Sequence, residues 1–74
     1  MTFETGKKYR DAIGRKWWVL CSRNVDGNTI LALGRYFVGG PNKYAIGVVE
    51  DDGKIATVLI EGGFTTIYDE EVKE

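Results

Sequence analysis

Turn signals rich in glycine and aspartate divide this chain into short runs, and their spacing is the feature that most limits its fold. They recur at intervals of about a dozen residues, with β-branched or aromatic runs between them. The apolar residues show no helical period in any window of useful length. This pattern is typical of a small β-sandwich or β-barrel. The turn signals are Asp11-Ala12-Ile13-Gly14, Asp26-Gly27-Asn28, Gly39-Gly40-Pro41-Asn42, Asp51-Asp52-Gly53 and Gly62-Gly63.

The runs between the turns predict strands over residues 7–10, 15–23, 29–38, 43–50, 54–61 and 64–68. Gly34 interrupts the third run, and a glycine inside a strand usually marks a bulge or a bend. A small barrel needs such a bend so that one strand can serve both halves of the sheet. We therefore predict a single all-β domain over residues 1–74, a five- or six-stranded antiparallel barrel that is SH3-like or OB-like. The acidic tail, residues 69–74, is expected to form a short helical turn or to fray.

The chain has few means of stabilising itself other than its core. It has 74 residues, one cysteine, Cys21, and no histidine. These counts exclude an internal disulfide and a zinc site of the usual kind. We expect no cofactor and no metal, and barrel closure or self-association remains as a source of extra stability.

Adjacent tryptophans indicate that one indole lies outside the core. Consecutive strand residues point to opposite faces of a sheet, so Trp17 and Trp18 cannot both be buried there. The more polar alternate set begins at Lys16, which places Trp17, Val19 and Cys21 inside and Trp18 and Leu20 outside. An outer Trp18 either contacts a partner or lies under a neighbouring loop or the C-terminal segment.

Two strands are apolar on both faces, residues 30–33 and 58–60, although a barrel in water needs only one apolar face. Such strands predict a second covered surface. This surface is either a homodimer interface or a patch for another macromolecule.

The net charge of −1 conceals an asymmetry between the two halves of the chain. Residues 1–39 carry seven Lys or Arg and three acidic residues, whereas residues 40–74 carry three Lys and eight acidic residues. The basic half could bind an anionic partner. Alternatively, the two halves pair opposite charges across neighbouring strands, which is the interpretation we favour.

Basic and aromatic side chains of the first half could together form a binding surface. They would neutralise phosphates and stack on bases, although the calculated pI near 5.4 argues against a nucleic-acid-binding domain. The wider set for a nucleic acid also includes Lys8, Tyr9 and Tyr44. The residues expected to contact a partner are Arg10, Arg15, Lys16, Trp18, Leu20, Arg35 and Tyr36.

No catalytic constellation is found, and we expect no enzyme. Cys21 has no histidine to activate it. The pair Asp51 and Asp52 precedes Gly53 and is explained by a turn. The glycines at 39 and 40 have neither the spacing of a P-loop nor a helix after them.

Hydropathy indicates no membrane segment, because no apolar stretch approaches the roughly 20 residues that span a bilayer. The N-terminus lacks the apolar core of a secretory signal. The chain is expected to be a complete cytoplasmic protein.

The opening of the chain, Phe3-Glu4-Thr5-Gly6-Lys7-Lys8-Tyr9-Arg10-Asp11 followed by Gly14-Arg15-Lys16-Trp17-Trp18-Val19-Leu20, resembles the first hairpin of many short β proteins of bacteriophages and mobile elements. The likeness covers about a quarter of the chain: a Gly-Lys-x-Tyr start, a glycine turn and an aromatic strand. The resemblance implies an accessory factor, such as an inhibitor of host defence that acts by binding.

These observations together predict a non-catalytic interaction protein, a phage accessory or host-defence inhibitor, that contacts a protein or a phosphorylated small ligand. One alternative is a nucleic-acid-binding small barrel. Another is a structural subunit that covers its spare apolar surface by homo-oligomerisation.

Overall fold

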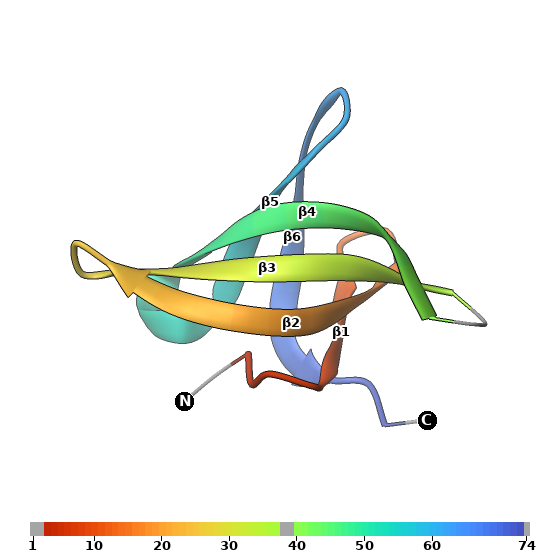
Figure 1. The fold of residues 1–74 in the computed structure, drawn as a ribbon, viewed down its shortest axis with the longest axis horizontal. Helices are drawn as coiled ribbons and strands as arrows, with labels where there is room; N and C mark the ends of the chain where they lie inside the picture. Colours follow the sequence, from red (N-terminus) through yellow and green to blue (C-terminus); the bar gives the residue numbers. More distant parts are fainter. Residues whose placement is uncertain (1–2, 38–39, 74) are drawn as a thin grey trace.

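The protein folds as a closed antiparallel barrel, seen in a computed structural model that describes residues 3–37 and 40–73 (Figure 1). Its strands are β1 (Lys8–Asp11), β2 (Lys16–Val25), β3 (Asn28–Phe37), β4 (Gly40–Glu50), β5 (Ile55–Ile60) and β6 (Gly63–Glu71), with a 3-10 turn, η1 (Asp51–Gly53), between β4 and β5. Each strand pairs with its neighbours in the chain, and β1 pairs with β6 to close the barrel. The predicted all-β barrel is confirmed, with six strands in the described residues. Its simple chain order contains no Greek-key crossover of the kind that OB folds use.

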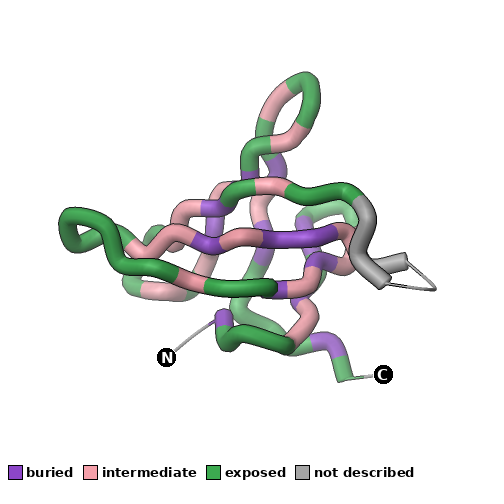
Figure 2. The backbone as a smooth tube through the Cα atoms, viewed as in Figure 1, coloured by how far each residue is buried: buried purple, intermediate pink, exposed green. Residues whose placement is uncertain are grey.

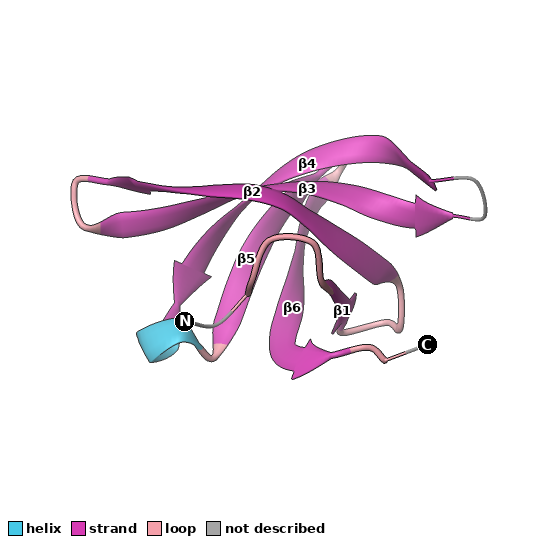
Figure 3. Ribbon diagram, turned by 60° about the horizontal axis from the view of Figure 1, so that its bottom comes forward, coloured by secondary structure: helices cyan, strands magenta, loops and turns pink. Residues whose placement is uncertain are grey.

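The barrel is flattened into two layers. Figure 3 shows the long strands β2, β3 and β4 lying across β5, β6 and β1. The β2–β3 hairpin extends beyond the barrel, and its tip is exposed (Figure 2). No helix in the described residues is long and apolar enough to cross a bilayer.

Two bulges bend the long strands, and the sequence indicated one of them. The β3–β4 register shifts next to Gly34, where the sequence predicted a bulge or a bend, but the extra residue lies on β4, since Gly34 pairs with Tyr44 and Tyr36 with Pro41. The β2–β3 register shifts between Val19 and Cys21, where Leu20 is the extra residue. A bulge inserts a residue and reverses the alternation of faces beyond it.

This second bulge corrects the predicted position of Cys21. Trp17 and Val19 are buried as expected, but Cys21 is exposed. Beyond the bulge, Cys21 pairs with the outward Ala32 rather than with a core residue. The prediction for Cys21 was wrong because strict alternation counts Leu20 as an ordinary strand position.

The C-terminal segment also differs from the prediction of a helical turn or a frayed end. Strand β6 continues through Glu71, which pairs with Tyr9 on β1. The Val72 N–H donates to the Lys8 carbonyl at 2.8 Å, and the Val72 side chain is buried. Barrel closure therefore satisfies backbone groups that an isolated acidic tail would leave to water.

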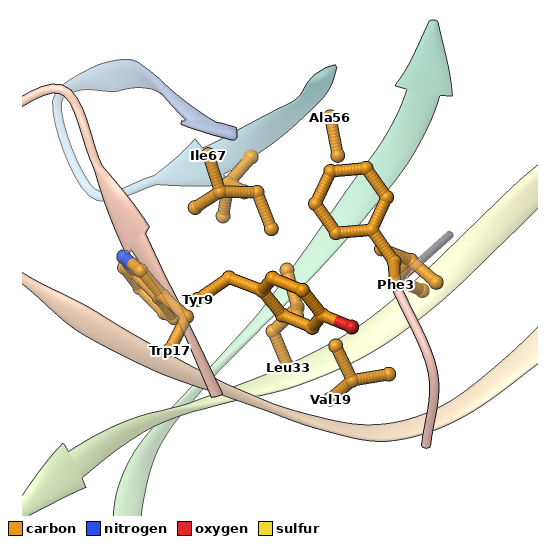
Figure 4. Close-up of a cluster of buried hydrophobic side chains, with 9 residues drawn as sticks. Phe3, Tyr9, Trp17, Val19, Leu33, Ala56 and Ile67 are labelled. Atoms are coloured by element: carbon orange, nitrogen blue, oxygen red, sulfur yellow. The ribbon is translucent and has the colours of Figure 1, made fainter. Parts of the chain in front are cut away.

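Aromatic side chains fill the part of the core nearest β1. Figure 4 shows the Tyr9 ring between the Trp17 indole and the Phe3 ring. The Phe3 and Tyr9 rings meet edge to face, with centroids 5.0 Å apart. The Tyr9 hydroxyl accepts a hydrogen bond from the Glu4 N–H at 2.8 Å, so the segment before β1 is held against the core. The buried core cluster is Phe3, Tyr9, Trp17, Val19, Leu31, Leu33, Ala56, Val58 and Ile67.

The absence of a side chain at Gly47 leaves room for the Leu33 side chain in the core. Gly47 is buried on β4, and a Cβ added there would lie 2.9 Å from Leu33 Cδ1. Because Leu33 is fully buried, it has little room to move. We expect Gly47→Ala to lower the free energy of unfolding by about 1 to 2 kcal/mol in urea denaturation. An unchanged midpoint would contradict this close packing.

Candidate functional site

A row of exposed apolar side chains crosses the outer face of three neighbouring strands. Ile46 on β4 pairs with Leu59 on β5, and Leu59 pairs with Phe64 on β6. Their exposed fractions are 48%, 52% and 70%. Directly paired residues lie on one face of a sheet with adjacent Cβ atoms, so these three form a continuous surface, here called the apolar row. The row confirms the expected apolar outer face for β5.

The next positions on the same face are also uncharged. Val48, Thr57 and Thr66 form the neighbouring register row across the same three strands. The Thr57 hydroxyl donates to the Glu50 carboxylate, which lies toward the η1 end of β4. The apolar row is thus bordered by a neutral strip, and its nearest carboxylate on that side is already hydrogen-bonded.

A second candidate site is a hollow of about 390 Å³ at one end of the barrel, here called the barrel mouth. It lies where β2 and β4 begin and where β3 and β5 end. Mouths of barrels are frequent ligand sites, and this volume lies within the usual range for small-molecule pockets. The lining residues are Arg15, Trp17, Arg35, Lys43, Tyr44, Ala45, Ile60 and Glu61.

Asp11 organises one side of the barrel mouth. Its side chain is fully buried, and Oδ2 accepts hydrogen bonds from Arg15 Nε at 2.6 Å and Trp17 Nε1 at 3.0 Å. Oδ1 accepts from the backbone N–H groups of Ile13 at 3.1 Å and Arg15 at 2.8 Å. Burial acts to raise the pKa of Asp11, but hydrogen bonds from Trp17, Arg15 and Ile13 outweigh it and lower the pKa below its usual value. The carboxylate therefore fixes both the turn and the positions of Arg15 and Trp17.

Arg35 and Lys43 supply further positive charge to the barrel mouth. Arg35 pairs with Trp17 across β2 and β3, and its guanidinium carbon lies 5.7 Å from the centre of the Trp17 ring. This is within cation–π distance, so the Trp17 ring helps to hold the guanidinium in place. Lys43 and Tyr44 are exposed at the start of β4, and Glu61 provides the one carboxylate in the lining.

The predicted partner-binding residues separate into different environments. Arg15 and Arg35 meet at the barrel mouth, whereas Arg10 donates to the Gly14 carbonyl at 3.3 Å and lines a hollow of about 450 Å³ with Glu70 and Glu71. Lys16 lies half-buried on β2. The structure therefore divides the predicted cations: Arg10 and Lys16 are cross-strand partners on β1 and β2, whereas Arg15 and Arg35 line the barrel mouth.

Of the remaining predicted residues, Trp18 and Leu20 lie on the outer face, and the Tyr36 side chain is outside the described part of the structure. Trp18 is half-buried, and its Nε1 donates to the Gly6 carbonyl at 3.0 Å, so the loop before β1 lies against it. Leu20 is exposed at the β2 bulge. Tyr36 belongs to β3, but its side chain lies outside the described part of the structure.

Charges of the two halves meet where β1 closes onto β6. Lys7 Nζ lies 3.3 Å from Glu4 Oε2 and 3.5 Å from Glu71 Oε1. Both carboxylates raise the pKa of Lys7, first through the hydrogen bond with Glu4. Arg10 shares its hollow with acidic residues of β6. Among the described residues, Lys7 and Glu71 join the two halves, whereas Lys7–Glu4 and Arg15–Asp11 are pairs within the basic half, so the interpretation of pairing between the halves stays a prediction.

Sequence reasoning missed three features of these sites. Asp11 was read only as a turn residue, although a buried Trp17 needs an acceptor for its N–H. Phe64 and Ile46 were read as ordinary strand residues, since register with Leu59 was unknown. Lys43 was assigned to the acidic half, and pairing of β3 with β4 brings it to the same hollow as Arg35.

The residues that the structure describes contain no group of three or more His, Cys, Asp or Glu side chains placed to hold a metal ion. The fold and its surfaces define a small closed β-barrel with an apolar outer row and a basic mouth. Comparison with family models, curated proteins and solved structures finds no match to this chain.

Proposed function

We propose that this chain is a non-catalytic binding protein that contacts a protein partner through the apolar row. The observation that carries the proposal is the direct cross-strand register of Ile46, Leu59 and Phe64, all substantially exposed. Single exposed apolar residues are common on proteins, but contiguous groups of this kind mark interaction surfaces. Phe64 supplies the aromatic anchor that energetically important interface positions favour.

A second copy of the chain is the partner that the charge pattern favours. In a two-fold dimer the same patch of each subunit faces its copy, so a charged residue near the axis would be repelled by the same residue of the other subunit. The apolar row and the strip of Val48, Thr57 and Thr66 carry no charge. This arrangement also supports the predicted alternative of a self-associating structural subunit.

Nucleic-acid binding is supported less well. Single-strand binding needs a continuous positive groove with stacking platforms. Arg10 pairs with Lys16 and lines the hollow that contains Glu70 and Glu71, whereas Arg15, Arg35 and Lys43 line the barrel mouth, so the cations divide between two places. A role as a phage accessory or host-defence inhibitor stays a prediction from the resemblance of the first hairpin.

Phe64→Ser tests the apolar row, with Ile13→Ser as its matched control. Phe64 and Ile13 are similarly exposed, at 70% and 72%, but Ile13 lies in the turn between β1 and β2. Sedimentation velocity measures self-association, and a photo-crosslinker at position 59 identifies other partners in the producing cell. Each complex is then rebuilt from purified components. We expect Phe64→Ser to weaken the complex by at least about tenfold and Ile13→Ser to leave it within about twofold.

Two results would refute the proposal. One is a monomer at all concentrations together with no specific crosslink. The other is an equal loss of affinity with Phe64→Ser and Ile13→Ser, since the row would then contribute nothing beyond general hydrophobicity.

A further inference from the structure

The barrel mouth combines cations, an aromatic ring and a partly open hollow, none of which belongs to the apolar row. Trp17 is buried, and directly paired residues share a face, so Arg35 points toward the interior end of the barrel. On β4, Lys43, Tyr44 and Ala45 all line the same hollow. Two cations from neighbouring strands therefore converge on one hollow.

Arg15 and Arg35 are held in position before any ligand arrives. Asp11 accepts a hydrogen bond from Arg15 Nε at 2.6 Å and another from Trp17 Nε1. The Arg35 guanidinium in turn lies over the Trp17 ring. Groups that are already ordered lose little conformational entropy when they bind a ligand. Asp11 balances the charge of Arg15, so the positive excess of the mouth comes from Arg35 and Lys43 against Glu61.

Guanidinium and ammonium groups bind phosphate oxygens through charge-assisted hydrogen bonds. Tyr44 is exposed beside Lys43 and lines the same hollow, where its ring can stack on a planar group. The volume of about 390 Å³ suits a small molecule. We infer that the barrel mouth binds a small phosphate ester with a planar ring, of the size of a mononucleotide, through Arg35, Lys43 and Tyr44.

Adenosine monophosphate is a suitable probe, with inorganic phosphate and adenosine as its separate parts. Titration calorimetry on the intact chain is expected to show saturable binding of adenosine monophosphate at sub-millimolar Kd and weaker binding of either part. No saturable binding of adenosine monophosphate at low millimolar concentration would overturn the inference.

Lys43→Gln and Lys54→Gln form a matched pair, because both lysines are exposed but Lys54 lies beside η1, away from the mouth. We expect Lys43→Gln to raise the Kd for adenosine monophosphate about fivefold or more. The Kd of Lys54→Gln should stay within about twofold of that of the unsubstituted protein. Equal weakening by both variants would overturn the inference, since it would show a general charge effect. Because both residues are exposed, neither substitution should disturb folding, and circular dichroism checks this.

Tyr44→Ala tests the planar part of the ligand. We expect it to raise the Kd for adenosine monophosphate about fivefold, while the Kd for inorganic phosphate stays within about twofold of its original value. Equal effects on both probes would contradict a stacking role. Tighter, strongly salt-dependent binding of a single-stranded oligonucleotide would also overturn the small-molecule assignment and favour a nucleic-acid interface.

Discussion

Replacing Trp17 by alanine is expected to lower the free energy of unfolding by about 3 to 5 kcal/mol. The indole is buried in the core, so its removal loses apolar burial and leaves a cavity. It also leaves Asp11 Oδ2 without one of its two donors. A domain of this length has a total stability of roughly 4 to 11 kcal/mol, so the loss takes a large share. Urea denaturation followed by far-ultraviolet circular dichroism measures it.

Trp18→Ala is the control for this prediction, because it removes the same side chain from the neighbouring position. Trp18 is half-buried and lies on the other face of β2, where its Nε1 donates to the Gly6 carbonyl. We expect a loss of about 1 kcal/mol. Equal destabilisation by the two substitutions would contradict the assignment of faces.

The strand pattern was predictable because turns and β-branched runs are local features. Opposite faces for Trp17 and Trp18 followed from alternation alone, and Gly34 marked the position of a register shift, although the extra residue lies on β4. The bulge at Leu20 has no such signal, since leucine occupies ordinary strand positions. The one inserted residue reverses the alternation of faces, so Cys21 was predicted on the wrong face.

Features that depend on the register between paired strands were not predicted. Excess apolar character was evident in the fifth strand, but the apolar row exists only because Leu59 lies opposite Ile46 and Phe64. Likewise, the predicted basic surface was assembled by sequence order. Barrel closure instead places Arg10 at the β1–β6 seam, and the β3–β4 hairpin brings Lys43 of the acidic half to the same hollow as Arg35.

Asp11→Asn is expected to lower the free energy of unfolding at neutral pH by about 2 to 3 kcal/mol. Each carboxylate oxygen accepts two hydrogen bonds, and an asparagine amide would place donors against one of these pairs. Arg15 would also lose its partner for a partly buried charge. Urea denaturation of both proteins at pH 7 measures the difference.

The Asp11 carboxylate also makes the free energy of unfolding depend on pH in the acid range. The pKa of Asp11 in the folded protein lies below the usual value of 3.8, so the folded state favours the charged form. This contribution is fully present above the unfolded pKa and is lost as the pH falls through the folded pKa. Between about pH 5 and pH 2, the unsubstituted protein should therefore lose stability more steeply than Asp11→Asn.

Asp26→Asn separates this effect from a general loss of negative charge. Asp26 is exposed in the β2–β3 turn with a positive φ of 51°, a conformation that asparagine also tolerates. Its variant should follow the acid profile of the unsubstituted protein, because substitutions at exposed turn positions change stability little. Parallel profiles for Asp11→Asn and the unsubstituted protein would mean that Asp11 contributes no acid-dependent stability. The network of Arg15 and Trp17 would then hold together through packing, and the mouth would not depend on the charge of Asp11.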